Sequence, residues 1–174
     1  MKETQHIISA LVANKSGALT RISGLFARRG YNIDSLSVCA TDSAKLSRMT
    51  ITTTADESTV QQIIKQLDKL YDVIKVTELS KNTSVTRELL MVKIVTEPKQ
   101  RPEIEATCNM YKAKLIDVSP DSTILELTGE PNKLDGFLNV VRDYGIIELT
   151  RTGMSALQRG KGSINDLTDY NETV

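Results

Sequence analysis

The turn Asn14–Gly17 combines residue types that can bind a small zwitterion. It precedes an amphipathic stretch, and the start of a helix exposes unpaired N–H groups and a partial positive charge that attract carboxylates. Gly17 would let a ligand approach the backbone, and the amide oxygen of Asn14 can accept a hydrogen bond from an ammonium group. A carboxylate and an ammonium group one carbon apart define an α-amino acid. Ser16 is also a good N-cap, however, and spacing alone favours an ordinary capped helix start.

A second polar turn, containing Asn32, follows the same helix. The helix has apolar residues at helical spacing and ends at Gly30, which we expect to be a left-handed cap. A helix of roughly 10–12 residues is about 15–18 Å long, so Asn14 and Asn32 of one subunit are too far apart to hold one small ligand. Two subunits packed in antiparallel fashion would bring Asn14 of one next to Asn32 of the other. The commoner alternative is that Asn32 is only a turn residue.

The residues of catalytic or metal chemistry are sparse. The chain has one histidine, His6, which we interpret as a strand-end residue, and two isolated cysteines, Cys39 and Cys108. Zinc sites need about four ligands at characteristic spacing, so we expect no metal site. Because no serine has a histidine and an acid at diagnostic spacing, we expect no catalytic residues.

Composition narrows the function classes further. The 174 residues include 22 basic and 22 acidic ones, which gives zero formal charge and weighs against a nucleic-acid binder. Aromatic residues make up 4% of the chain, too few for deep aromatic cages. The sequence shows no signal peptide, transit segment or long apolar span, and its cysteines are few. We therefore expect a soluble protein of the cytoplasm.

The elements that must position the two turns follow a recognisable order. The first half reads as strand, helix, strand, strand, helix, strand. The strands are expected at residues 6–13, 33–40, 46–53 and 73–79, and Asp56 or Ser58 is expected to cap the second helix. After a polar stretch the same order restarts, with strands at 89–95, 114–119, 123–128 and 146–152 and helices at 101–111 and 131–142.

This repeated order predicts an α+β protein of two tandem ferredoxin-like βαββαβ domains. Each is a four-stranded antiparallel sheet with two helices on one face. The other face of each sheet is left bare and must meet a partner, a ligand or a second sheet. We assign residues 1–79 to the first domain, 80–86 to a linker and 87–160 to the second domain, and we expect 161–174 to be a disordered tail.

Several motifs together resemble a known family. They are Asn14–Leu19, Gly24–Phe26, Arg29–Ile33 and Leu46–Ile51 in the first half, with Arg87–Leu89, Val92–Ile94, Ile116–Val118, Lys133–Asp135, Thr152–Gly153 and Arg159–Gly160 in the second. Over about residues 5–160 the chain resembles the small, regulatory subunit of acetohydroxyacid synthase, also called acetolactate synthase.

The resemblance implies that the first domain is an ACT domain, a module that senses amino acids. It also implies a homodimer joined through this domain and bound to large catalytic subunits, with no nucleic acid or membrane as partner. The small subunit would activate the catalytic subunits and confer feedback inhibition by a branched-chain amino acid, usually valine. Thiamine diphosphate, Mg and FAD would belong to the catalytic partner, and this chain would carry no cofactor and no activity of its own.

Carried over residue by residue, the resemblance implies an effector site shared between two subunits. One subunit would supply Asn14, Ser16, Gly17, Ala18 and Leu19, and the other Asn32 and Ile33; Thr20 and Gln62 are further candidates. Cys39 stands where the family pattern leads us to expect a small apolar residue, and this bears on how the pocket packs.

Two other functions stay open from the sequence. A stand-alone amino-acid sensor would bind its ligand through the same turn without a thiamine enzyme. A small enzyme of the acylphosphatase type would share the fold, but it needs an arginine and an asparagine around a phosphate. The choice among valine, leucine and isoleucine is also open, because one methylene discriminates by only about 1–3 kcal/mol.

Overall fold

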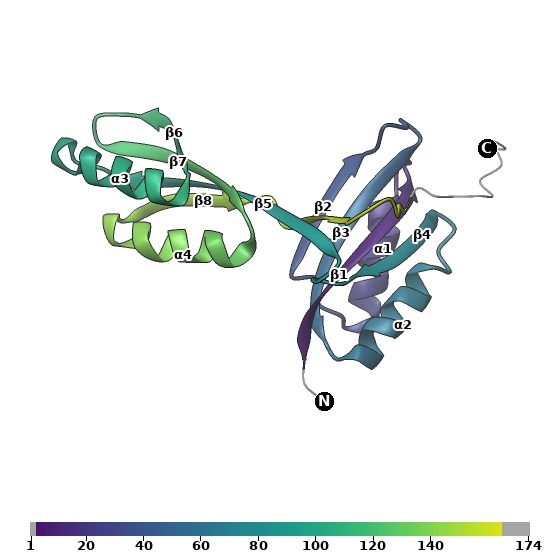
Figure 1. Ribbon diagram of the computed structural model, residues 1–174. Helices are drawn as coiled ribbons and strands as arrows, with labels where there is room; N and C mark the ends of the chain where they lie inside the picture. The colour runs from purple at the N-terminus through teal and green to yellow at the C-terminus, as the bar shows by residue number, and fades with distance from the viewer. Residues whose placement is uncertain (1–2, 165–174) are drawn as a thin grey trace. The chain divides into compact units, whose positions relative to one another are not determined.

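The first domain is an antiparallel sheet with two helices on one face (Figure 1). The structure, a computed structural model, describes residues 3–164. The elements of this domain are β1 (Thr4–Ala13), α1 (Ala18–Arg29), β2 (Ser35–Ala40), β3 (Leu46–Ala55), α2 (Glu57–Leu67) and β4 (Val73–Leu79). The strand order is β2-β3-β1-β4, so β2 and β4 are the edges of the sheet. The predicted order of elements is confirmed.

Alternation along β1 decides which side chains meet the helices. Ile8, Ala10 and Val12 point to the helix face and join the buried core. The same core takes Ile22, Leu25 and Phe26 from α1 and Val60, Ile63 and Leu67 from α2. The helix ends follow the sequence: Gly30 has φ 70° as the C-cap of α1, and the Asp56 side chain accepts from the Thr59 N–H at the start of α2.

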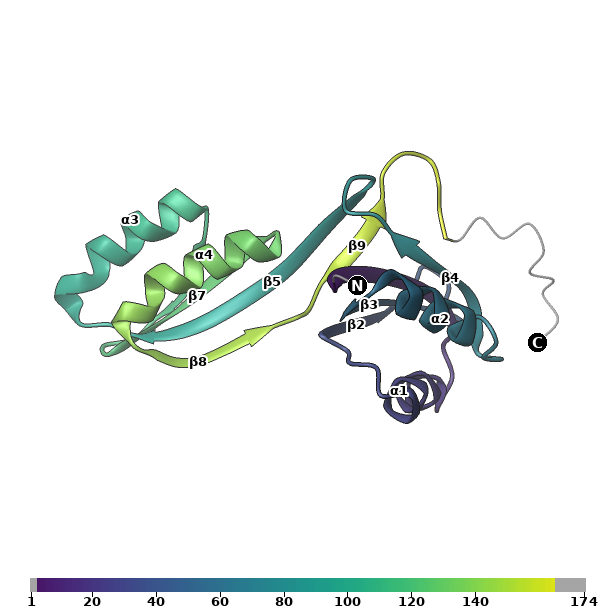
Figure 2. The same ribbon diagram turned by 90° about the horizontal axis from the view of Figure 1, so that it is seen from below.

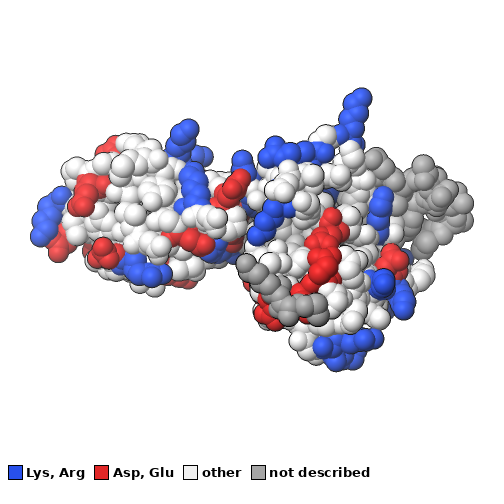
Figure 3. Space-filling model, turned by 60° about the horizontal axis from the view of Figure 1, so that its bottom comes forward, with Lys and Arg blue, Asp and Glu red and all other residues white. Residues whose placement is uncertain are grey.

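The second domain repeats the arrangement. Its elements are β5 (Ser84–Val95), α3 (Arg101–Tyr111), β6 (Lys114–Val118), β7 (Ser122–Gly129), α4 (Pro131–Val141) and β8 (Ile146–Arg151), with short 3-10 turns at Pro98–Gln100 and Arg142–Tyr144. The strand order is β6-β7-β5-β8. The core lies between this sheet and its two helices, where Phe137 is fully buried. On the face drawn in Figure 3, charges of both signs are interspersed over each domain.

The borders of the domains differ from those expected. The polar stretch 80–86 is shorter than a free linker, because only residues 81–83 form a turn and β5 already begins at Ser84. Residues 154–164 group with the first domain, which therefore comprises residues 3–85 and 154–164 of the described chain, although the sequence suggested one domain over 87–160. Of the expected disordered tail, residues 165–174 lie outside the described part of the chain, whereas Ile164 is buried.

The returning segment, residues 154–158, contains a strand that the sequence did not predict, β9 (Ser155–Gln158). Met154 and Ala156 pack with Ile7 and Leu79, and all four are at most 6% exposed. The Arg48 guanidinium donates to the carbonyl of Ala156 at 3.1 Å. Figure 2 shows β9 on the side of the first sheet away from α1 and α2. We call residues 154–158 the strap; it covers part of the sheet face that we expected to be bare.

Candidate effector site

The turn before α1 differs in one respect from the sequence expectation. Ser16 is not the N-cap: the cap is Gly17, in the left-handed conformation with φ 89°. Glycine adopts this conformation without the steric cost that a Cβ brings, which explains why Gly17 and not Ser16 is the cap. No side chain among the described residues caps the helix start. The first-turn N–H groups of α1 are therefore not claimed by a carboxylate or hydroxyl of the described chain.

Asn14 is held in place through its nitrogen atoms. Its backbone N–H donates to the carbonyl of Lys45 at 2.7 Å, and its side-chain Nδ2 donates to the carbonyl of Ala44 at 2.9 Å. With the amide nitrogen committed to the hairpin between β2 and β3, the amide oxygen is the atom left to accept from a ligand. This is the role that an ammonium group needs.

An ion pair between an exposed arginine and a buried aspartate anchors the same turn. Arg21, on the first turns of α1, donates to the carboxylate of Asp72, which is 3% exposed. The carbonyl of Asp72 accepts from the Ala13 N–H at 2.8 Å, where β1 ends. The turn is thereby tied to the loop between α2 and β4, which holds it in position.

The residues of this turn differ in what they can offer a ligand. Ser16, Gly17, Leu19 and Thr20 are exposed, and Leu19 is an apolar side chain with 46% exposure. Ala18 is 4% exposed and packs inward, and its N–H donates to the carbonyl of Lys15 at 3.3 Å, so the N–H groups of Leu19 and Thr20 are the ones open to a ligand. The start of α1 thus combines N–H donors, the Asn14 oxygen and one apolar side chain.

The second predicted group lies at the other end of α1. Asn32 is exposed; its Nδ2 donates to Asp34 at 2.7 Å, and its carbonyl accepts from the Thr53 hydroxyl at 2.7 Å. Ile33 is half-buried against the core. Gln62 belongs to this end, because its Oε1 lies 3.5 Å from the hydroxyl of Tyr31. Asp34 and Thr53 orient this turn, and no motif in the sequence pointed to either residue.

The structure therefore gathers the predicted residues into two groups and keeps them apart. Asn14, Ser16, Gly17, Ala18, Leu19 and Thr20 lie at the start of α1, and Asn32, Ile33 and Gln62 lie near its end. The 12 residues of α1 separate the groups by about 18 Å. One subunit does not bring them together around one small ligand.

The corresponding helix start in the second domain is already occupied. The Glu97 side chain accepts from the backbone N–H of Gln100, and the Gln100 side chain accepts from the backbone N–H of Glu97, at 2.9 Å, which completes a capping box. A carboxylate of the chain itself thus takes the place that a ligand carboxylate would need. Of the two equivalent loops, only the one at Gly17 is open.

The serines near His6 do not form a catalytic pair in the described chain. His6 bonds to Glu78 and Thr4, whereas Ser35 bonds to Thr52 at 2.7 Å. The hydroxyl of Ser9 is buried without a partner among residues 3–164. Within residues 3–164 the geometry offers a binding site at α1, and neither Ser9 nor Ser35 is hydrogen-bonded to His6.

Comparisons with known proteins place the chain in a family. A family model described as the AHAS small subunit-like ACT domain matches residues 8–75, and one for the small subunit of acetolactate synthase matches residues 87–160. A probable acetolactate synthase small subunit of Archaeoglobus fulgidus is 47% identical over 90% of this chain and 98% of its own length. The chain belongs to the acetolactate synthase small-subunit family.

Other members of the acetolactate synthase small-subunit family agree in sequence and structure. The isozyme 3 small subunit of Escherichia coli is 45% identical over 90% of this chain and 96% of its own. The crystal structure of the small subunit from Thermotoga maritima superposes with a TM-score of 0.85 at 35% identity, covering 91% of this chain and 99% of that one. The ACT-domain match contains both turns of α1. No helix within the described residues is long and apolar enough to cross a membrane.

Proposed function

We propose that this chain is a regulatory subunit that binds a branched-chain amino acid, with valine the first candidate, between the ACT domains of two copies. The observation that carries the proposal is the glycine-capped start of α1, beside which the Asn14 amide oxygen has no hydrogen-bond partner among residues 3–164. The ligand carboxylate would accept from the first-turn N–H groups of α1, and its ammonium group would donate to Asn14. The exposed Leu19 would contact the aliphatic side chain.

The second copy supplies what one subunit lacks. β2 is an edge strand whose Val38 is 43% exposed, and edge strands present unpaired N–H and C=O groups for another strand. Antiparallel pairing of two β2 strands about a two-fold axis would continue the sheet and set the two α1 helices antiparallel. The open start of one α1 would then lie near Asn32 and Ile33 of the partner. Dimerisation is thus part of ligand binding.

The partner of this dimer is the acetolactate synthase catalytic subunit. Membership of a family of small subunits supports such an assembly. Thiamine diphosphate, Mg and FAD belong to that subunit, where two 2-oxo acids are condensed. The chain described here would activate the catalytic subunit and, with the amino acid bound, inhibit it. An effector shifts such an equilibrium only by its differential affinity for the two states, typically about 1–3 kcal/mol.

Mixing two inactive variants tests whether the site is shared. Gly17→Asp and Asn32→Ala should each abolish valine binding in the homodimer. In a mixed dimer one site carries both changes and the other carries neither. Random exchange in a 1:1 mixture makes half of the dimers mixed, so we expect calorimetry to recover about a quarter of the wild-type sites. If each site lay within one subunit, mixing would restore nothing. Alanine, which lacks the branched side chain, serves as the ligand control.

A second assay tests the partner. The chain should co-purify with an acetolactate synthase catalytic subunit, stimulate its turnover, and make that turnover sensitive to valine. A chain that binds valine but neither co-purifies with nor stimulates the catalytic subunit would instead be a stand-alone sensor.

A further inference from the structure

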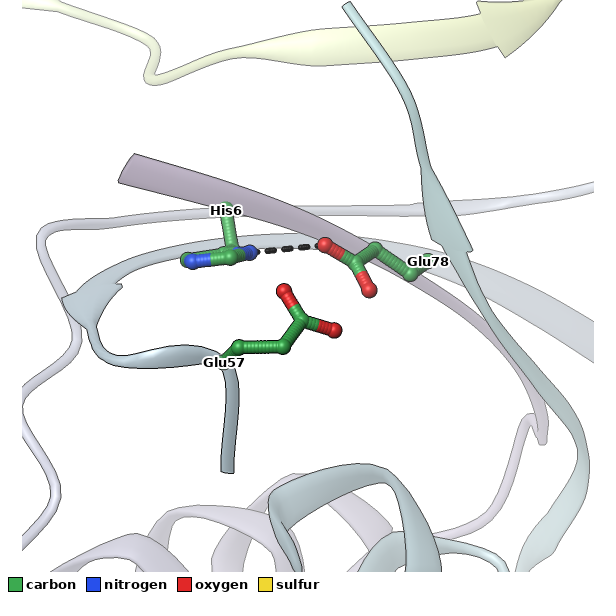
Figure 4. A group of neighbouring side chains, drawn as sticks. All are labelled: His6, Glu57 and Glu78. Carbon is green, nitrogen blue, oxygen red and sulfur yellow. Dashed lines mark hydrogen bonds and ion pairs between the residues drawn. The ribbon is translucent and has the colours of Figure 1, made fainter. Parts of the chain in front are cut away.

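Three side chains that are far apart in sequence meet at one end of the first domain. His6 comes from β1, Glu57 is the first residue of α2, and Glu78 comes from β4 (Figure 4). Their ligand atoms, one nitrogen or oxygen from each, all lie within 4.8 Å of one another. His6 is 9% exposed, so its imidazole lies in a largely water-free position. From the sequence we interpreted His6 as a strand-end residue, and that interpretation did not include the two neighbouring glutamates.

The pairing register of β1 and β4 places His6 and Glu78 on the same face of the sheet. Ile8 pairs with Glu78, and Ile8 points to the helix face. His6 lies two residues before Ile8 and therefore points the same way. Glu57, in the first turn of α2, lies on the same face of the sheet as His6 and Glu78. The cluster is consequently fixed by one strand pair and one helix start.

The charges of the cluster are not balanced by the described part of the chain. Glu78 has His6 as its only ion-pair partner there, and Glu57 has none. Glu57 accepts only from the side-chain amide of Gln61, at 3.1 Å. Two carboxylates close to one imidazole repel each other unless a cation lies between them. What the cluster lacks is positive charge.

The imidazole is oriented for a ligand role. Its Nδ1 lies 2.7 Å from Oε1 of Glu78, and its Nε2 lies 3.0 Å from the hydroxyl of Thr4. With Nδ1 protonated, the Thr4 hydroxyl donates to Nε2. With Nδ1 bound to a metal, the ring proton is on Nε2, and Nε2–H donates a hydrogen bond to the same hydroxyl, because a hydroxyl can either donate or accept. Such a second partner on the other ring nitrogen is typical of metal-ligating histidines.

We propose that His6, Glu57 and Glu78 bind one zinc ion, with water as the fourth ligand. The nitrogen donor favours zinc over magnesium, which prefers oxygen ligands in octahedral geometry. Zinc bonds of about 2.0–2.2 Å place tetrahedral ligand atoms roughly 3.4 Å apart, so Glu57 must move inward while Nδ1 of His6 and Oε1 of Glu78, which lie 2.7 Å apart, separate slightly. Glu57 can supply that movement because its side chain is exposed.

The ion would join β1, β4 and α2 at the end of the sheet that also carries Asn32. His6 pairs with Thr53 across the β1–β3 ladder, and the hydroxyl of Thr53 donates to the carbonyl of Asn32. Zinc would therefore stabilise the strands behind the second half of the effector site. The proposed zinc would be a structural ion, and its binding does not depend on the proposed effector.

Zinc titration of the untagged, chelator-treated protein tests the site. We expect one zinc ion per chain by calorimetry and a rise in melting temperature, because a ligand of the folded state stabilises it. Since His6 is the only histidine, its single imidazole NMR signal should shift on zinc addition and not on magnesium addition. Cobalt in place of zinc should give the visible absorption bands of a tetrahedral site.

Matched variants decide whether the binding belongs to this cluster. Glu57→Gln removes one ligand at an exposed position and should weaken zinc binding at least about tenfold. Glu105→Gln, an exposed glutamate on α3, should leave binding unchanged. Circular dichroism checks that both variants fold. Equal zinc affinity of both variants, or an unmoved His6 signal at saturating zinc, would mean an adventitious ion only and would overturn the assignment.

Discussion

Replacing Gly17 by aspartate separates the backbone role of this residue from its role in ligand binding. A Cβ at Gly17 would meet no atom within 4 Å, so aspartate causes no collision. The residue must still adopt φ 89°, which costs a non-glycine residue about 1–2 kcal/mol. For a chain of this length we expect the melting temperature to fall by only a few degrees.

The effect on the ligand should be much larger. The new carboxylate projects from the helix start where the carboxylate of the amino acid would lie. Two like charges ~5 Å apart at an effective dielectric constant of ~20 repel by about 3 kcal/mol, which weakens binding roughly a hundredfold. Feedback inhibition by valine should be lost, whereas stimulation of the catalytic subunit should largely survive. Calorimetry with valine and inhibition curves of the reconstituted enzyme measure the two effects.

Gly160→Asp is the matched control for this experiment. Gly160 also has a positive φ, of 81°, and open space around its Cβ position. It should show a similar loss of stability but bind valine like the wild type. If Gly17→Asp also bound valine with the wild-type dissociation constant, the carboxylate would not lie at the start of α1, and the proposed site would be wrong.

Three further changes test the fold around the site. Glu88→Ala breaks the double contact with Arg151, at 2.6 and 2.9 Å. Because Arg151 is 28% exposed and keeps Asp135 as a partner, this change should cost about 1–2 kcal/mol in urea unfolding of the second domain. Met154→Ala should cost about 2–3 kcal/mol in unfolding of the first domain, because it opens the packing under the strap. Hydrogen bonds from Ser58 and Thr59 lower the pKa of Asp56 to about 2, so its cap stabilises the fold fully above pH ~4 and loses this effect as the pH falls through about 2. The melting temperatures of the wild type and Asp56→Ala should accordingly differ at neutral pH and converge near pH 2.

Local sequence determined most of the elements of the fold. Apolar periodicity located the helices, and Gly30 and Asp56 marked two of their ends, because cap chemistry depends on neighbouring residues. At the start of α1 the same reasoning chose Ser16 over Gly17. Both residues suit a cap, and the path of the chain out of β1 decides between them. Such a choice depends on tertiary structure and not on propensity.

The strap and the group formed by His6, Glu57 and Glu78 were not predicted, for a different reason. β9 has four residues with one buried side chain, too few for a detectable alternation, and its partners Ile7 and Arg48 lie more than 100 residues away. His6, Glu57 and Glu78 match no spacing motif, because the sheet register and a helix start bring them together. Contacts of this kind become visible only when the topology is known.

The return of the chain through the strap makes the first domain discontinuous. The second domain, residues 86–153, is in effect an insertion between β4 and the strand that finishes the first sheet's far face. During synthesis, β1 to β4 leave the ribosome long before residues 154–158 do, so Ile7 and Leu79 stay uncovered while the second domain is being made. Residues made after the second domain thus complete the domain that is synthesised first. A nascent chain that stops short of Met154 therefore carries an exposed apolar patch by which quality-control proteins can recognise it as unfinished.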